Sequence, residues 1–141
     1  MANHSELPAG ASQIVDVRDF EGDGQLTLIH GYGGGGFRIA KQAYDGDQLL
    51  LPRQRFDWQA PSWDAITISD LEPLLTEPVP PLLIMGLGKA PQGLLPELQV
   101  ELHQRGVSME IMSTAAACRT WNVLLSEGRY AALALLAVDD K

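Results

Sequence analysis

The sequence predicts a single α/β domain, in which an antiparallel β-hairpin portion in the N-terminal half precedes a β-α-β-α-β parallel unit. Three observations support this fold class. The chain of 141 residues is long enough for one domain with a sizeable core. Its first half holds short alternating runs separated by glycine-rich turns, and its second half alternates continuous apolar runs with helical segments. Strands that alternate with helices form parallel sheets through right-handed crossovers.

The domain is expected to occupy residues 14–138. Residues 1–13 mix Ser, Pro, Gly and Ala with little periodicity, so they are predicted to form a flexible tail. A short edge strand is expected near residues 14–17. Residues 139–141 are expected to form an acidic tail.

The first half is predicted to be a series of antiparallel strands. Alternating apolar residues predict strands at residues 25–30 and 37–44, and a third strand follows at residues 47–51. Asp45-Gly46 lies between the second and third of these strands, which is a strong hairpin signal. Residues 56–58 are expected to continue the sheet.

A glycine-rich run at residues 31–36, Gly-Tyr-Gly-Gly-Gly-Gly, matches the dinucleotide-binding pattern G-x-G-x-x-G. In that pattern the glycines open a helix whose N-terminus holds the pyrophosphate. Here the next residues alternate and include β-formers, so a strand is expected to follow. We therefore interpret the run as a flexible hairpin connection and expect no nucleotide cofactor.

The alternation of apolar and polar residues that is typical of strands ends at Ser69, where the second half of the domain begins. Ser69 and Glu72 form a capping-box pattern, which predicts a short helix or turn that ends near Leu75. Residues 82–85 form a continuous apolar run, as expected of a strand covered on both faces. A helix is predicted at residues 94–105.

The last three predicted elements are a strand at residues 107–112, a long helix at residues 113–127 and a strand at residues 130–138. A hydroxyl residue, Ser113 or the one after it, can cap the start of the helix, and Gly128 can end it.

Helical spacing divides this long helix into two faces. Arg119 and Asn122 are three residues apart and share one face. The opposite face is predicted to be a buried stripe made of Thr114, Cys118, Trp121 and Leu125.

The composition excludes several classes of protein. A formal net charge of −8 argues against a nucleic-acid binder and disfavours docking on anionic membranes. No apolar run approaches the roughly 20 residues of a membrane-spanning helix, and the first residues lack the features of a secretory signal or a mitochondrial presequence. Because Cys118 is the only cysteine, no internal disulfide can form, and we expect a cytoplasmic protein.

Metal and catalytic motifs are missing from the sequence. His4, His30 and His103 lie in separate segments, with no spacing that resembles a metal motif. Cys118 lies on the apolar stripe of its helix, where most cysteines are inert. We therefore expect no metal, no cofactor and no enzymatic activity.

The carboxyl edge of the parallel strands is the place where a ligand site is expected. The turn Gly86-Leu87-Gly88-Lys89 and the start of the long helix at Thr114 should meet there, with two helix N-termini pointing the same way. Lys89 and Arg119 would add positive charge for a small anion or an acidic side chain. The alternative is a tight glycine turn with Lys89 in solvent and Arg119 paired within its own helix.

Several motifs in the second half together resemble a known family. The motifs are Gly86-Leu87-Gly88-Lys89, Leu94-Leu95-Pro96-Glu97-Leu98, Gly106-Val107, Glu110-Ile111-Met112, Ala117-Cys118-Arg119-Thr120-Trp121-Asn122-Val123-Leu124 and Glu127-Gly128-Arg129. They resemble the small single-domain family of unknown function that includes mitochondrial respiratory complex I assembly factor 3 and its bacterial and archaeal relatives. The resemblance is specific over residues 82–138 and looser before them. The family more often has Tyr at the position of Trp121.

This resemblance implies a layered α/β domain without established enzymatic activity, and the absence of a presequence suggests a bacterial member. The hypothesis that follows is a non-enzymatic protein-interaction module, which aids the assembly of a respiratory or other membrane-associated complex from the cytoplasmic side. Apolar strand edges in the first half would allow a dimer.

The alternative function is a small-anion or metabolite-binding protein, with its crevice at the carboxyl edge of the parallel strands. The candidate residues for a partner contact or a ligand are Gly86, Gly88, Lys89, Thr114, Cys118, Arg119, Asn122 and Arg129.

Overall fold

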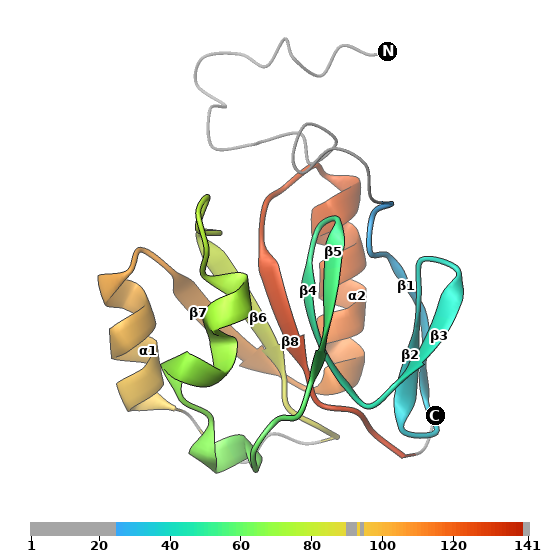
Figure 1. The fold of residues 1–141 in the computed structure, drawn as a ribbon, viewed down its shortest axis with the longest axis horizontal. Helices are drawn as coiled ribbons and strands as arrows, with labels where there is room; N and C mark the ends of the chain where they lie inside the picture. Colours follow the sequence, from blue (N-terminus) through green and yellow to red (C-terminus); the bar gives the residue numbers. More distant parts are fainter. Residues whose placement is uncertain (1–24, 90–92, 94, 140–141) are drawn as a thin grey trace, which may run out of the picture.

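The computed structural model describes residues 25–89, 93 and 95–139. The expected tail at residues 1–13, the edge strand near residues 14–17 and the end of the acidic tail lie outside these residues. The described part contains two sheets and two α-helices, together with short 3-10 helices that include η4 (Trp63–Ala65) (Figure 1).

The first sheet is antiparallel and has three strands in chain order. They are β1 (Ile29–Gly33), β2 (Gly36–Ile39) and β3 (Gln42–Asp45). The second sheet has five strands in the order β5-β4-β8-β6-β7. They are β4 (Asp47–Leu51), β5 (Gln54–Trp58), β6 (Leu82–Gly86), β7 (Ser108–Met112) and β8 (Ala132–Leu135).

The predicted parallel unit is confirmed. Strand β6 pairs in parallel with both β7 and β8. The crossovers carry α1 (Pro96–Gln104) and α2 (Thr114–Ser126), each one or two residues shorter at its ends than the pattern predicts. Ser113 caps α2, since its hydroxyl accepts a hydrogen bond from the Ala116 N–H at 3.1 Å.

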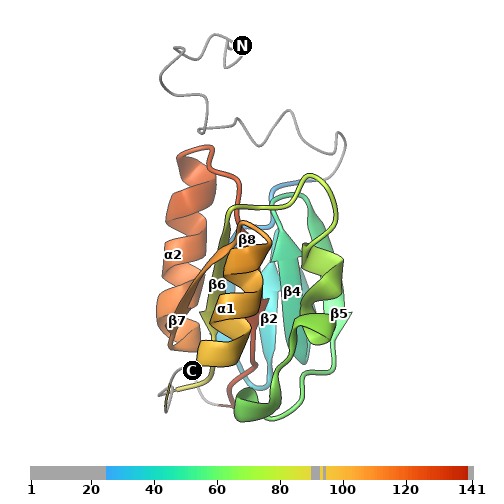
Figure 2. The same cartoon turned by 90° about the vertical axis from the view of Figure 1, so that its left-hand side faces the viewer.

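The five-stranded sheet lies between two apolar layers. On one face α2 and the three-stranded sheet pack against Ile84, Leu133 and Leu135. On the other face α1 and the 3-10 helix η5 (Ile68–Leu74) pack against Leu83 and Met85, and Figure 2 shows α2 and the green 3-10 segment on opposite sides of the strands. Strand β6 is therefore covered on both faces, as its unbroken apolar run predicts.

Three predictions for the first half need correction. The strand expected at residues 25–30 is β1, which begins later and extends into the glycine run. The strand expected at residues 37–44 is broken into β2 and β3 by a tight turn, in which Ala40 has φ +58°. The sequence gives no sign of this turn, because the turn residues Ala40 and Lys41 are neither glycine, proline, asparagine nor aspartate.

The Asp45-Gly46 turn is not a hairpin, which is the third correction. Strand β3 pairs with β2, whereas β4 pairs with β5 and β8 in the other sheet. The turn therefore carries the chain from one sheet to the next. The capping box also lies two residues earlier than predicted, where Thr67 and Asp70 bond reciprocally at the start of η5.

Candidate functional site

The carboxyl edge of the parallel strands is closed by hydrogen bonds from Thr114. This fully buried residue accepts a hydrogen bond at its hydroxyl from the Gly88 N–H at 2.9 Å and donates one to the Leu136 carbonyl at 2.7 Å. Its own N–H donates to the Gly88 carbonyl at 2.8 Å. The polar groups of Thr114 thus join the turn after β6 to the start of α2.

Gly86 allows α2 to approach the sheet at this point. A Cβ built on Gly86 would lie 2.8 Å from Ala117 Cβ, 2.9 Å from Leu135 Cδ2 and 3.0 Å from Thr114 Cα. Such distances leave no room for a side chain. The glycine therefore serves helix packing, and the family motif at this turn has a structural explanation.

Asn122 also makes internal contacts. Its Oδ1 accepts from the Ile29 N–H at 2.8 Å, and its Nδ2 donates to the Ile29 carbonyl at 2.7 Å. From the preceding residue of the same helix, the Trp121 indole N–H donates to the Thr27 carbonyl at 3.0 Å. Helix α2 therefore holds the start of β1 through side-chain bonds to its backbone.

Cys118 lies buried under α2, as the apolar stripe predicts, with 4% of its surface exposed. Burial raises the pKa of its thiol to about 12, and this effect outweighs the nearby charge of Arg119, which lowers the pKa. The thiol is therefore protonated at neutral pH. A protonated, buried thiol is a poor nucleophile.

The remaining three predicted residues are exposed. Lys89 follows the closed turn, and Arg119 lies on the outer side of α2, where it makes no hydrogen bond or ion pair with the described residues. Arg129 lies at the opposite end of the sheet, because it precedes β8, which runs parallel to β6. The structure thus brings Gly86, Gly88 and Thr114 together and separates Arg129 from them.

Arg129 lines a pocket of about 820 Å³ at the amino ends of the parallel strands, which we call the amino-end pocket. Its floor is largely apolar, and its rim carries two carboxylates and one guanidinium. The lining residues are Pro81, Leu82, Ser108, Glu110, Leu124, Glu127, Arg129, Tyr130 and Ala131. Sequence reasoning missed this pocket, because three segments far apart in the chain contribute to it.

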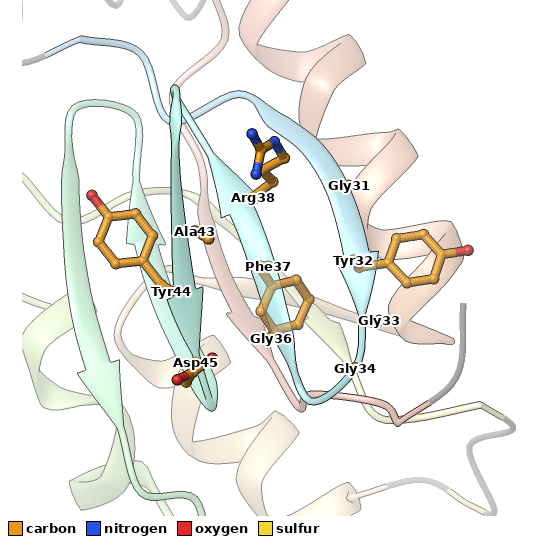
Figure 3. Close-up of a pocket in the computed structure, with 10 residues that line it drawn as sticks. All are labelled: Gly31, Tyr32, Gly33, Gly34, Gly36, Phe37, Arg38, Ala43, Tyr44 and Asp45. Atoms are coloured by element: carbon orange, nitrogen blue, oxygen red, sulfur yellow. The ribbon is translucent and has the colours of Figure 1, made fainter.

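The glycine run lines a second, shallow pocket of about 330 Å³ on the three-stranded sheet (Figure 3). Gly34 and Gly35 form the turn between β1 and β2, which confirms the hairpin interpretation of this run. Tyr32, Phe37 and Tyr44 lie opposite one another across the three strands. The glycines therefore do not open a helix, as a dinucleotide site would require.

No group of three or more His, Cys, Asp or Glu side chains in the described part of the chain is arranged to hold a metal ion. None of its helices is long and apolar enough to cross a membrane.

Comparison with known proteins gives a family match. The model of a protein family of unknown function, DUF498/DUF598, matches residues 29–136, from the start of β1 to just past β8. An uncharacterized protein of Rhodobacter capsulatus is 43% identical over 110 residues, which are 77% of this chain and 82% of that protein.

A named relative and a solved structure are also similar. NADH dehydrogenase (ubiquinone) 1 alpha subcomplex assembly factor 3 of Danio rerio is 35% identical over 111 residues, which are 78% of this chain and 64% of that protein. The chain therefore spans less than two thirds of this relative. A crystal structure of an outer membrane protein from Bartonella henselae is 35% identical, with a TM-score of 0.74 over 82% of this chain and 98% of that one.

Proposed function

We propose that this chain, which belongs to the DUF498/DUF598 family of proteins of unknown function, is a protein-interaction module. It would aid the assembly of a respiratory or other membrane-associated complex from the cytoplasmic side. The observation that carries this proposal is the 35% identity with the Danio rerio assembly factor over 78% of the chain. The closed carboxyl edge, where Thr114 bonds internally, favours this function over small-ligand binding at that edge.

The surface proposed for the partner is the outer side of α2 together with the amino-end pocket. Arg119, Val123 and Glu127 are spaced four residues apart, so they form one exposed ridge along the helix. Among the residues that the structure describes, Val123 is one of two large apolar residues that are prominently exposed, at 53%. The ridge runs into the pocket, because Glu127 lines it.

The chemistry of this surface suits a segment of a protein partner. Leu82 and Leu124 supply apolar contact area, and charges of both signs surround them at Glu110, Glu127 and Arg129. An apolar centre with a charged rim is the usual arrangement of protein interfaces. The two carboxylates would repel a phosphate-rich ligand at the same place.

A genetic complementation experiment tests the proposed function. Deletion of the gene from the native host should lower the amount of assembled NADH dehydrogenase, measured on native gels and as NADH oxidation by membranes. Wild-type protein should restore both. Val123→Glu should fail to restore them, because a charge would replace the apolar contact.

Val100→Glu is the matched control, since Val100 is exposed to 57% on α1 and lies outside the proposed surface. It should restore assembly as well as the wild type does. Both variants should keep the melting temperature of the wild type, which separates lost binding from lost folding. Normal NADH dehydrogenase in the deletion strain would refute the assembly role, and equal rescue by both variants would refute the proposed surface.

A further inference from the structure

We propose that the pocket between the β2–β3 turn and the β4–β5 turn binds a small polyanion that carries phosphate or carboxylate groups. This pocket has a volume of about 430 Å³ and is lined by Lys41, Arg53 and Arg55. Three of the ten basic side chains of a chain with net charge −8 therefore meet in one cavity. None of the described lining residues is acidic.

Arg55 supplies a guanidinium held in a fixed orientation. Its Cζ lies 3.7 Å from the centre of the Tyr44 ring, and Figure 3 shows Tyr44 pointing from β3 towards the green strands that carry Arg55. Nη1 donates to Gln48 Oε1 at 2.7 Å and to Asp57 Oδ1 at 2.6 Å. Stacking and these two bonds fix the plane of the guanidinium.

Two donor groups of this guanidinium are left for a ligand. Nη2 and Nε of Arg55 make no hydrogen bond with the described residues. The side chain is only 25% exposed, so an anion at these donors would bind a guanidinium that is partly shielded from water. Because Asp57 is 78% exposed, its charge is largely screened by solvent and only partly offsets that of Arg55. A bidentate oxyanion matches the free edge of the guanidinium.

Lys41 reaches the same pocket from the tip of the β2–β3 turn. It makes no ion pair with the described residues. The preceding Ala40 has φ +58°, and its N–H donates to the Leu28 carbonyl at 2.8 Å. A non-glycine residue in this conformation costs free energy and persists where the surroundings fix it. The turn that presents Lys41 is therefore held in place.

Thr27 and Leu28 together connect the two turns that border the pocket, because Leu28 accepts from Ala40 in the β2–β3 turn and Thr27 bonds to the β4–β5 turn. The Thr27 N–H donates to the Pro52 carbonyl at 2.9 Å, and its hydroxyl donates to the Leu51 carbonyl at 2.8 Å. The β4–β5 turn is thus fixed to the segment that leads into β1. Lys41 and Arg55, which are supplied by different strand pairs, are therefore held in fixed relative positions. This lowers the entropic cost of binding an anion.

The size of the cavity favours a small ligand over a macromolecule. About 430 Å³ lies within the range of small-molecule sites. The high negative charge of the whole chain repels extended polyanions at long range, whereas short charge-assisted bonds act inside the cavity. A compact ligand with two or three anionic groups would satisfy Lys41 and Arg55 together.

Titration of the full chain with pyrophosphate and with citrate, at constant ionic strength, tests this inference. Backbone amide NMR should give saturable shifts at residues 40–42 and 53–55. The dissociation constant should rise at least about tenfold in Lys41→Gln and in Arg55→Gln, since each change removes a charge-assisted bond. Lys41 is exposed, so its variant tests binding without affecting the fold.

Arg38→Gln is the matched control, because Arg38 is exposed on β2 and does not line this pocket. It should bind as the wild type does. A preference for pyrophosphate would assign a phosphate ligand, and a preference for citrate would assign a carboxylate ligand. The inference is overturned if neither anion binds by about 10 mM, if Arg38→Gln weakens binding as much as Lys41→Gln, or if only a glutamate-rich peptide binds.

Discussion

The two ends of the parallel strands β6 and β8 are built in opposite ways. At the carboxyl end, Gly86 and Thr114 bring α2 into contact with the sheet, and three hydrogen bonds join Thr114 to its neighbours. At the amino end, the longer side chains of Leu124, Glu127 and Arg129 surround a pocket of about 820 Å³. The same pair of strands thus has one end closed by packing and one end open.

A glycine turn at the carboxyl edge of a strand is therefore not by itself a ligand site. Open α/β sheets commonly bind ligands at that edge when helix N-termini point into a crevice. Here the hydroxyl of Thr114 lies at the start of α2, where a ligand would be expected. It accepts a hydrogen bond from the Gly88 N–H and donates one to the Leu136 carbonyl. Substitutions at the closed end should therefore lower the stability of the protein, whereas substitutions at the open end should weaken the binding of a partner.

Gly86→Ala should give the largest loss of stability. The added Cβ would meet Ala117 and Leu135 within 3 Å, so α2 must move away from the sheet. We expect the free energy of unfolding to fall by about 3 kcal/mol, measured by urea denaturation. Gly31→Ala is the control, since its Cβ would meet only ordinary contacts at 3.8 Å and beyond. Equal effects of the two changes would contradict the close packing of the carboxyl end.

Thr114→Val should have the next largest effect. The isosteric change removes the hydroxyl and leaves the Gly88 N–H and the Leu136 carbonyl without this partner. The expected loss is about 2 kcal/mol in the same measurement. Thr120→Val is the control, because within the described part of the chain the hydrogen bond of the Thr120 hydroxyl goes to the Met112 sulfur, at 3.5 Å. A loss below about 0.5 kcal/mol in Thr114→Val would show that these bonds do not close the edge.

Alkaline pH should destabilise the protein through Cys118. Burial raises the pKa of this thiol from 9.0 to about 12, so the folded state keeps the proton when the unfolded state loses it. The stabilising contribution is complete below pH 9 and is lost as pH rises towards about 12. Between about pH 8 and about pH 10 the free energy of unfolding should fall by roughly 1.4 kcal/mol.

The Cys118→Ala variant provides the reference for this experiment. It lacks the thiol but keeps the other groups that titrate at high pH. The difference in unfolding free energy between wild type and variant should be constant up to about pH 8 and should shrink above pH 9. A difference that stays constant up to pH 10 would mean that the thiol ionises as readily in the folded protein.

Changes at the open end should have the smallest effect on stability. Arg129→Gln alters an exposed side chain on the rim of the amino-end pocket. We expect its free energy of unfolding to stay within about 0.5 kcal/mol of the wild type. A loss comparable to that of Thr114→Val would show that this end is also closed by packing.

Local patterns were sufficient for much of the second half. The unbroken apolar run in β6 indicates a strand buried on both faces, and the stripe through Cys118 and Trp121 indicates the buried side of α2. Ser113 and Gly128 mark the ends of that helix, where φ of Gly128 is +71°. Each of these patterns is local, because the residues that form it belong to the element that it predicts or directly adjoin it.

The first half was harder to predict, because its turns look alike in sequence. A glycine turn joins β1 and β2, a strained Ala40 turn joins β2 and β3, and Gly46 directs the chain into another sheet. The Asp45-Gly46 pair correctly indicates the backbone conformation of a turn. That signal does not specify which strands pair on either side of the turn.

The parallel unit, the buried face of α2 and the lack of a dinucleotide-binding helix after the glycine run could all be predicted from the sequence, since each depends on neighbouring residues. The position of β8 between β4 and β6, the closure of the carboxyl edge by Thr114 and the placement of Lys41 and Arg55 in one pocket became known from the three-dimensional structure. These features depend on contacts between residues far apart in the chain. The period of a pattern specifies which side of an element is apolar, and packing then selects the partner that covers it.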